Sequence, residues 1–185
     1  MTENSQAELY LSFAGIFHRP SLEISKHLEE FIDLWEEEIP SIKSEVVALR
    51  QFCKDYAPGE QRMNALWEHY IPLFETGKVE APPYASIYLN PEQQVMGVET
   101  FNVRKFYHSA GYDLGQGADQ LPDHLAVELE FMALLARDGE EEQLKKFRQI
   151  HLLPFLAKIL PIIERSIRPI YFPVARILRT WQFSD

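Results

Sequence analysis

The chain has 185 residues, of which 46% are hydrophobic and 12% aromatic, enough to build a packed core and to exclude an intrinsically disordered protein. Its 18 Lys and Arg against 28 Asp and Glu give a formal net charge of -10. A surface with this charge repels nucleic-acid phosphates and anionic membranes and favours basic ligands. We therefore expect no nucleic-acid partner.

The cysteine content and the N-terminus predict a cytoplasmic protein. Cys53 is the single cysteine, so no internal disulfide can form. The first residues, MTENSQAELYLSF, contain no basic segment followed by an apolar core, and so do not look like a signal peptide. No stretch approaches the roughly 20 apolar residues that a membrane span needs, and we expect no membrane insertion.

Apolar residues recur at helical spacing along most of the chain, which predicts an all-α fold. Pro20 ends a first helix, and Ser21 is the predicted N-cap of a second. A third helix has Val47 among its predicted buried residues and ends at Pro58-Gly59. A fourth helix is predicted from about residue 60 to residue 74.

Helical periodicity resumes after Pro91. It is interrupted by a glycine-rich stretch, by Asp138-Gly139, and again before a tail that is predicted to be helical after Pro173. The glycine-rich residues 111–120, GYDLGQGADQ, separate two halves of the chain and form a candidate hinge between subdomains. The helix after them is predicted to begin at Pro122, with Asp123 at its positive end. The simplest arrangement is a single domain over residues 1–185, a helical bundle of about nine to ten helices.

Common catalytic motifs are missing from the sequence. It contains no Walker-type loop, no G-x-G-x-x-G after a strand, no G-x-S-x-G elbow and no H-E-x-x-H. Cys53 lies in the middle of a predicted helix, which favours a structural thiol over a nucleophile. Gly111, Gly115 and Gly117 lack the Lys-Ser/Thr of a phosphate loop, so a connector is the favoured interpretation. We expect no enzyme.

His124 and Glu128 are four positions apart and so lie on one face of the predicted helix. A small hydrolase or nucleotide-dependent enzyme using this pair for acid-base chemistry is one hypothesis, and it requires a substrate pocket. A metal site needs further ligands, and the other histidines lie on separate segments, so we expect no metal. The simplest interpretation is a hydrogen-bonded pair at the helix start. With Asp123, the same groups could also dock another chain's backbone and basic side chains.

The segment APPYASIYL, residues 81–89, combines a stiff backbone with recognition side chains. Pro82 and Pro83 fix an extended conformation ahead of Tyr84, Ser86 and Tyr88. Aromatic and hydroxyl groups of this kind form adaptable recognition surfaces. The composition alone favours a rigid connection whose tyrosines pack into the core. Its combination with other segments shifts the balance toward recognition.

Three segments occur in order: YIPLF at residues 70–74, PPYASIY at residues 82–88 and LPDHLAVELEF at residues 121–131. Together they resemble the signature blocks of the TorD/DmsD family of redox enzyme maturation chaperones. Those blocks are an aromatic-x-x-Leu-Phe helix end, a Pro-Pro-aromatic-x-Ser-x-aromatic loop and a Pro-Asp-His helix start followed by Glu. Residues 147–155 resemble a fourth block, so the matches span roughly residues 67 to 155.

The resemblance implies an all-α chaperone dedicated to molybdenum-cofactor oxidoreductases, with the Pro-Asp-His block inclining toward the TorD branch. Such chaperones bind the twin-arginine signal peptide of the immature enzyme, and often its folded body, and delay export until the cofactor is inserted. The client-binding residues implied by position are Leu73, Phe74, Pro83, Tyr84, Ser86, Pro122, Asp123, His124 and Glu128. Tyr84 stands where several relatives have Trp, so the block does not define client preference.

The charge of the chain agrees with this interpretation. A twin-arginine leader has a basic segment followed by an apolar stretch, and an acidic protein attracts it over long range. We expect carboxylates such as Asp123 or Glu128 to pair with the leader arginines, and Leu73, Phe74 and Tyr84 to line a cleft for the apolar stretch.

Several questions stay open at this stage. The sequence does not identify the client oxidoreductase, or whether its leader or its folded body is the main contact. It predicts no cofactor, but leaves open whether a guanine nucleotide or the molybdenum cofactor touches the protein. The glycine-rich connector permits domain swapping between two copies of the chain. A monomer and a homodimer are therefore both open. A structural subunit of a larger helical assembly is a third hypothesis.

Overall fold

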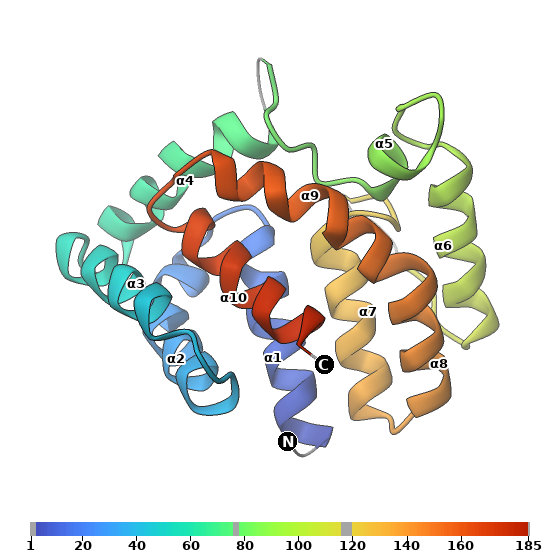
Figure 1. Cartoon of the computed structure of the whole chain (residues 1–185), viewed down its shortest axis with the longest axis horizontal. Coiled ribbons are helices and arrows are strands. Elements are labelled where there is room, and N and C mark those ends of the chain that lie inside the picture. The colour runs from blue at the N-terminus through green and yellow to red at the C-terminus, as the bar shows by residue number, and fades with distance from the viewer. Residues whose placement is uncertain (1–2, 76–77, 116–119, 185) are drawn as a thin grey trace. The chain divides into compact units, whose positions relative to one another are not determined.

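The computed structural model describes residues 3–75, 78–115 and 120–184, and its regular elements are helices (Figure 1). Within these ranges no strand occurs; the one extended pairing is an isolated antiparallel bridge between Tyr84 and His124. The predicted all-α fold is confirmed.

The chain forms two compact units. Unit 1 comprises Met1–Ala14 and Pro83–Ile159, and unit 2 comprises Gly15–Pro82 and Leu160–Asp185. Helices α1 (Glu3–Phe17) and α9 (Leu153–Arg165) each pass from one unit into the other.

The predicted hinge at residues 111–120 is not where the units divide, because it lies inside unit 1. The start of this segment is tied down: the Tyr112 amide donates to the Tyr107 carbonyl (3.0 Å) and the Tyr112 hydroxyl to Asp138 Oδ2 (2.6 Å). Residues 116–119 of the predicted hinge lie outside the described ranges. A single domain over residues 1–185 stays a prediction.

Unit 2 contains α2 (Leu22–Glu38), α3 (Lys43–Asp55), α4 (Glu60–Phe74) and α10 (Tyr171–Phe183). Helix α2 packs against α3 and α4, and α10 packs against α3 (Figure 1).

The boundaries of these helices follow local chemistry. Ser21 caps α2, as predicted, with its Oγ accepting from the Ile24 amide (3.2 Å). Gly59, at φ 109°, caps α4 after the predicted break at Pro58. The prediction that Val47 is buried was wrong: it is 70% exposed, because Val46 and Leu49 occupy the inward face of α3.

Arg62 is fully buried in unit 2 and joins three of its helices. Its Nε donates to the Tyr56 carbonyl (3.0 Å) and its Nη1 to the Ser25 carbonyl (3.0 Å). Its Nη2 donates to Glu29 Oε1 (2.6 Å) and to the Cys53 carbonyl (3.1 Å). A charge buried this completely is tolerated because its donors are matched by fixed acceptors.

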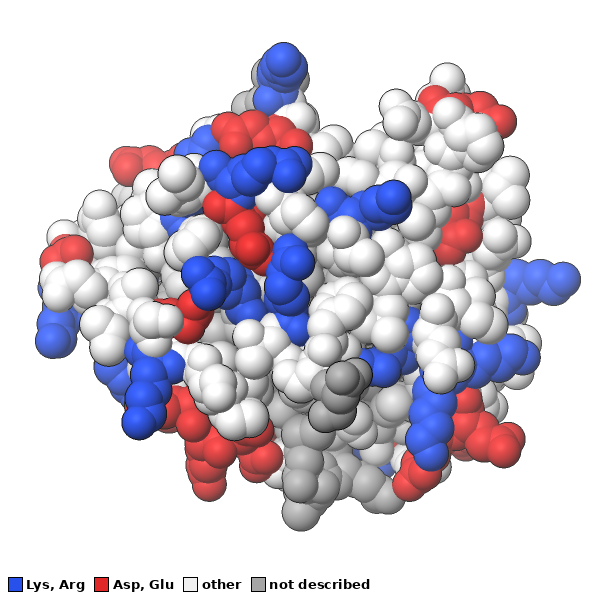
Figure 2. Space-filling model, in the orientation of Figure 1, with Lys and Arg blue, Asp and Glu red and all other residues white. Residues whose placement is uncertain are grey.

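Basic side chains gather over α10 and the adjoining end of α9, with acidic side chains between them (Figure 2). They form partly exposed ion pairs within unit 2, of a kind that adds little to stability but neutralises charge locally. The pairs are Arg168–Glu80 (2.6 Å), Arg179–Glu164 (2.7 Å) and Arg176–Glu45 (3.0 Å).

Unit 1 contains α5 (Ala85–Leu89), α6 (Val98–Ser109), α7 (Leu125–Arg137), α8 (Glu141–Phe147) and the π-helical segment η1 (Arg148–Leu152), which leads into α9. Helix α5 contacts α6, and α7 contacts α8. The core of the unit is aromatic, with Tyr107, Phe131 and Phe147 mutually in contact at ring-centroid distances of 4.2 to 5.7 Å.

The π-helical turn between α8 and α9 has a cause in the sequence. Pro154 has no amide hydrogen and its ring would clash with the carbonyl four residues earlier in a regular α-helix. The wider turn, in which the Leu153 amide donates to the Arg148 carbonyl, precedes this proline. It places His151 inward, with its Nδ1 2.6 Å from Glu99 Oε1 on α6.

The Arg62 network predicts a large loss of stability on substitution. We expect Arg62→Met to lower the free energy of unfolding by about 3–5 kcal/mol, because it leaves buried carbonyl acceptors unpaired. Arg50→Met is the matched control: Arg50 is 39% exposed and pairs with Asp33 and Glu36, so its loss should amount to less than about 1 kcal/mol. Urea denaturation measures both. Equal losses for the two variants would contradict the structural role given to Arg62.

Candidate functional site

Two of the sequence blocks meet in unit 1 through a short antiparallel junction. The Leu125 amide donates to the Pro83 carbonyl (2.8 Å), and the Ala85 amide donates to the Asp123 carbonyl (2.9 Å). A third bond, from the Ser86 amide to Asp123 Oδ2 (2.9 Å), joins residues 37 positions apart. The proline-rich segment and the start of α7 are therefore held together at one place.

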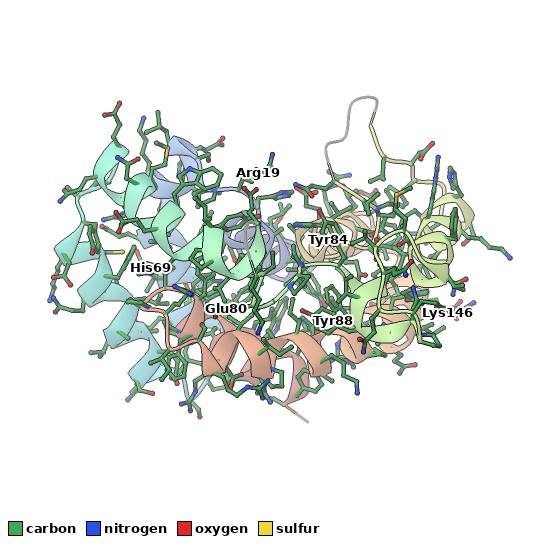
Figure 3. The ribbon with its side chains drawn as sticks, turned by 90° about the horizontal axis from the view of Figure 1, so that it is seen from above. Arg19, His69, Glu80, Tyr84, Tyr88 and Lys146 are labelled. Carbon is green, nitrogen blue, oxygen red and sulfur yellow. The ribbon has the colours of Figure 1, made fainter. Side chains whose placement is uncertain are left out.

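Tyr84 and His124 face each other at this junction. Their rings are in edge-to-face contact, with centroids 5.2 Å apart, and the Tyr84 hydroxyl donates to Gln120 Oε1 (3.1 Å). Tyr84 is half-buried, whereas His124 is 1% exposed. Tyr84 precedes α5 and Tyr88 lies within it (both labelled in Figure 3). Of Tyr84 and His124, Tyr84 is the residue accessible to a ligand.

Helix α7 begins at Leu125, three residues later than predicted. His124 is its N-cap: the backbone is extended and Nδ1 accepts from the Ala126 amide (3.2 Å). The Asp123 carboxylate, expected at the positive end of the helix, instead accepts from the Ser86 amide on the neighbouring segment. The tertiary bond to Ser86 has displaced the local helix start.

Asp123 and Glu128 are both 0% exposed. Both side chains are enclosed in the folded chain, and their expected pairing with leader arginines stays a prediction. Asp123 Oδ1 and both Glu128 carboxyl oxygens have no hydrogen-bond partner among the described residues. Burial, and after it the nearby Asp123 and Glu99, raise the pKa of Glu128 well above its ordinary value of 4.5. Burial therefore favours the neutral carboxylic acid form of Glu128 in the folded chain.

The remaining residues predicted in unit 1 belong to the same junction. Pro83 and Pro122 are buried, and the Pro122 carbonyl accepts from the Tyr107 hydroxyl (2.8 Å). Ser86 is also fully buried, and its Oγ has no partner in the described part of the chain. Burial raises the pKa of the Tyr107 hydroxyl well above its ordinary value, with Glu128 and Asp123 adding to the shift.

Leu73 and Phe74 belong to unit 2, whereas the junction lies in unit 1. Both are buried at the end of α4, where the Leu73 carbonyl accepts from the Ala81 amide (2.8 Å). The Phe74 ring packs edge-to-face on Phe17 and Tyr171. In this structure these two residues build the core of their own unit.

Sequence reasoning missed two supports of the junction, Gln120 and Tyr107, and the Glu99–His151 pair elsewhere in unit 1. Gln120 ends the glycine-rich segment and Tyr107 lies on α6, and neither position carries a motif. The 2.6 Å Glu99–His151 contact spans 52 residues. The helical periodicity after Pro91 pointed to α6 itself but not to these contacts.

The geometry gives little support to acid-base chemistry by His124 and Glu128. In the described structure no hydrogen bond joins the two side chains, and His124 Nδ1 is engaged in capping α7. Burial raises the pKa of the Cys53 thiol, which disfavours a nucleophilic thiolate. The described residues contain no group of three or more His, Cys, Asp or Glu placed to hold a metal ion. None of the described helices is long and apolar enough to span a bilayer.

The chain is similar to known proteins over most of its length. A family model described as nitrate reductase delta subunit matches residues 36–160, more than half of the chain. The chaperone protein TorD of Shewanella sp. (strain MR-4) is 27% identical over 153 residues, covering 79% of this chain and 73% of that protein. The Tat proofreading chaperone DmsD of Salmonella paratyphi A is 24% identical over 100 residues, covering 54% of this chain and 49% of that protein.

A solved structure shares the fold. A protein from Archaeoglobus fulgidus assigned to redox enzyme maturation superposes with a TM-score of 0.66 at 24% sequence identity. The match covers 97% of this chain and 94% of that one. The likeness extends over both units and concerns the fold alone.

The buried Glu128 carboxyl predicts a pH dependence of stability. Because the folded chain holds this proton to a higher pH than the unfolded chain, its contribution is complete below pH 4.5 and is lost as the pH rises through the raised pKa. Glu128→Gln replaces the ionisable carboxyl group with an amide that does not titrate. We expect the unfolding free energy of the variant minus that of the parent to increase with pH, by at most about 1.4 kcal/mol per pH unit.

Urea denaturation between pH 5 and pH 9 measures this difference. Glu92→Gln, at an exposed glutamate of the same unit, is the control and should show a difference that does not change with pH. A flat difference for Glu128→Gln would contradict the assignment of a buried neutral carboxyl.

Proposed function

Because the chain belongs to the nitrate reductase delta subunit family, the family of the TorD and DmsD chaperones, we propose that it is a cytoplasmic chaperone of molybdenum-cofactor oxidoreductases. It binds the precursor of such an enzyme through its twin-arginine leader, its apo form or both. Binding assists cofactor insertion and delays export until the enzyme is mature.

The observation that carries this proposal is the junction of the two most distinctive sequence blocks. Residues 82–88 and 121–131 are far apart along the chain, yet three hydrogen bonds of 2.8 to 2.9 Å tie them together in unit 1. A fixed backbone here presents the half-buried Tyr84 beside the start of α7. Such preorganisation lowers the entropic cost of binding a polypeptide.

The names of the relatives support a chaperone over the hydrolase and structural-subunit hypotheses. Those named relatives are chaperones, and one is a Tat proofreading chaperone. A binding function also needs only surface complementarity, which suits a site whose carboxyl groups are buried away from solvent. The net charge of -10 complements the basic segment of a leader.

Within the proposed client surface the predicted residues have different parts. Tyr84 contacts the client, as the half-buried aromatic of the junction. The buried residues around Tyr84 hold it in position from the interior of the fold; they are Pro83, Ser86, Pro122, Asp123, His124 and Glu128. Leu73 and Phe74 would act through the packing of unit 2. From the sequence we predict that the chain has no resident cofactor and that it is a monomer or a homodimer. Both stay predictions.

Calorimetric titration with synthetic twin-arginine leaders from candidate molybdoenzymes tests the proposal. We expect one leader to bind with a Kd of about 1 μM or tighter, and replacement of both arginines by alanine to weaken it at least about tenfold. Each lost arginine removes a charge-assisted hydrogen bond and part of the attraction to an acidic surface.

A pull-down with the chain as bait and the apo enzyme without its leader as prey is the second part of this test. If the apo enzyme binds and no leader does, the folded body is the contact and the leader is not. Failure of every leader and every apo enzyme would contradict a chaperone of this class.

A further inference from the structure

Unit 1 has an acidic and aromatic surface groove that the junction does not use. We propose that this groove, formed by α6, the chain after it and α7, binds the guanidinium group of an arginine in the client polypeptide. The inference rests on the proposed function and deepens it. Asp123 and Glu128 are enclosed, so a leader arginine needs other carboxylates.

The floor of the groove is one face of α7. Val127, Phe131 and Leu134 lie at helical spacing along it, and Tyr107 of α6 completes the apolar base. The groove has a volume of about 180 Å³. Sites for drug-sized ligands and cofactors occupy about 300–1,000 Å³, so this one fits a single side chain.

Two carboxylates stand at the groove, and its lining contains no Lys or Arg among the described residues. Asp113 is exposed; its Oδ1 accepts from the Leu114 amide (2.8 Å) and lies 3.7 Å from His108 Nε2. Glu130 lies on α7 one position before Phe131 and is half-buried. Acidic groups beside an apolar floor favour a cation, and a partly desolvated one gains more than it would in water.

An aromatic wall makes the groove suited to a planar cation. The Tyr112 hydroxyl donates to Asp138 Oδ2 (2.6 Å), and its ring stands edge-to-face on Phe131, with centroids 5.5 Å apart. Burial and the bond to Asp138 raise the pKa of Tyr112 to about 12, so this hydroxyl stays protonated and the ring stays anchored. Guanidinium groups stack on aromatic rings and pair with carboxylates in a fixed fork, which an ammonium group cannot do.

The groove is connected to the candidate site through Tyr107. The Tyr107 ring lines the groove, and its hydroxyl donates to the Pro122 carbonyl of the junction (2.8 Å). Both features therefore belong to unit 1 and share Tyr107.

Leader titrations with Asp113→Asn and Glu130→Gln test the assignment. Asp113→Asn keeps an oxygen to accept from the Leu114 amide, so the loop is retained while the charge is lost. We expect each substitution to weaken the twin-arginine leader roughly three- to tenfold, and to leave the double-alanine leader unchanged. Glu92→Gln, which removes the same charge at an exposed position in the loop before α6, should leave both affinities unchanged.

A second probe works without a leader. N-acetyl-arginine methylamide, followed by NMR of the labelled chain, should shift the amides of residues 112–115 and 127–134, and the lysine analogue should shift them less. If the parent distinguishes the two leaders but neither variant differs from it, the groove assignment is overturned and the proposed function stands. If no leader binds, the proposed leader contact fails. If the arginine analogue also leaves the amide signals of residues 112–115 and 127–134 unshifted, the groove assignment is overturned as well.

Discussion

The hydrogen bonds that join residues 83–86 to residues 123–125 are the constraint on which the candidate site depends. Two are backbone bonds of an isolated antiparallel bridge, and the third uses the Asp123 carboxylate as an acceptor for the Ser86 amide. A bridge this short is not stable by itself. It persists because the prolines on both sides restrict the backbone, and because α7 begins directly after it.

Several buried polar groups follow from this one constraint. Drawing Asp123 inward removes it from solvent, and Glu128 one turn further along α7 is enclosed with it. The cost is offset in different ways: Asp123 accepts a hydrogen bond, whereas Glu128 takes up a proton. We propose that Asp123, through its bond to the Ser86 amide, helps to hold the start of α7 in place, and that carboxylates at the surface contact the basic ligand.

Local features of the fold were predictable from the sequence because their causes are local. The N-cap at Ser21, the break at Pro58-Gly59 and the helical periodicity depend on neighbouring residues. The late start of α7 and the burial of Asp123 were not predictable, since both depend on a bond to Ser86, 37 residues away. The short helix α5 was hidden for a similar reason: five residues after two prolines carry too little periodicity to be recognised.

The candidate site shows the same limit. Family resemblance selected Pro83, Tyr84 and the Pro-Asp-His block, and the structure joins these in unit 1. The resemblance could not distinguish a residue that contacts a ligand from one that supports such a residue, because a sequence motif does not show which side chains are buried. Leu73 and Phe74 were grouped with the others by motif order, but the contacts place them in unit 2.

Hydrogen–deuterium exchange of the chain, alone and with a client precursor, tests whether the client binds at this junction. We expect slower exchange on binding in peptides that cover residues 83–89 and 120–131, with α2 and α3 unchanged. Slower exchange confined to α2, α3 or α10, with the junction unchanged, would contradict it and move the client surface to unit 2.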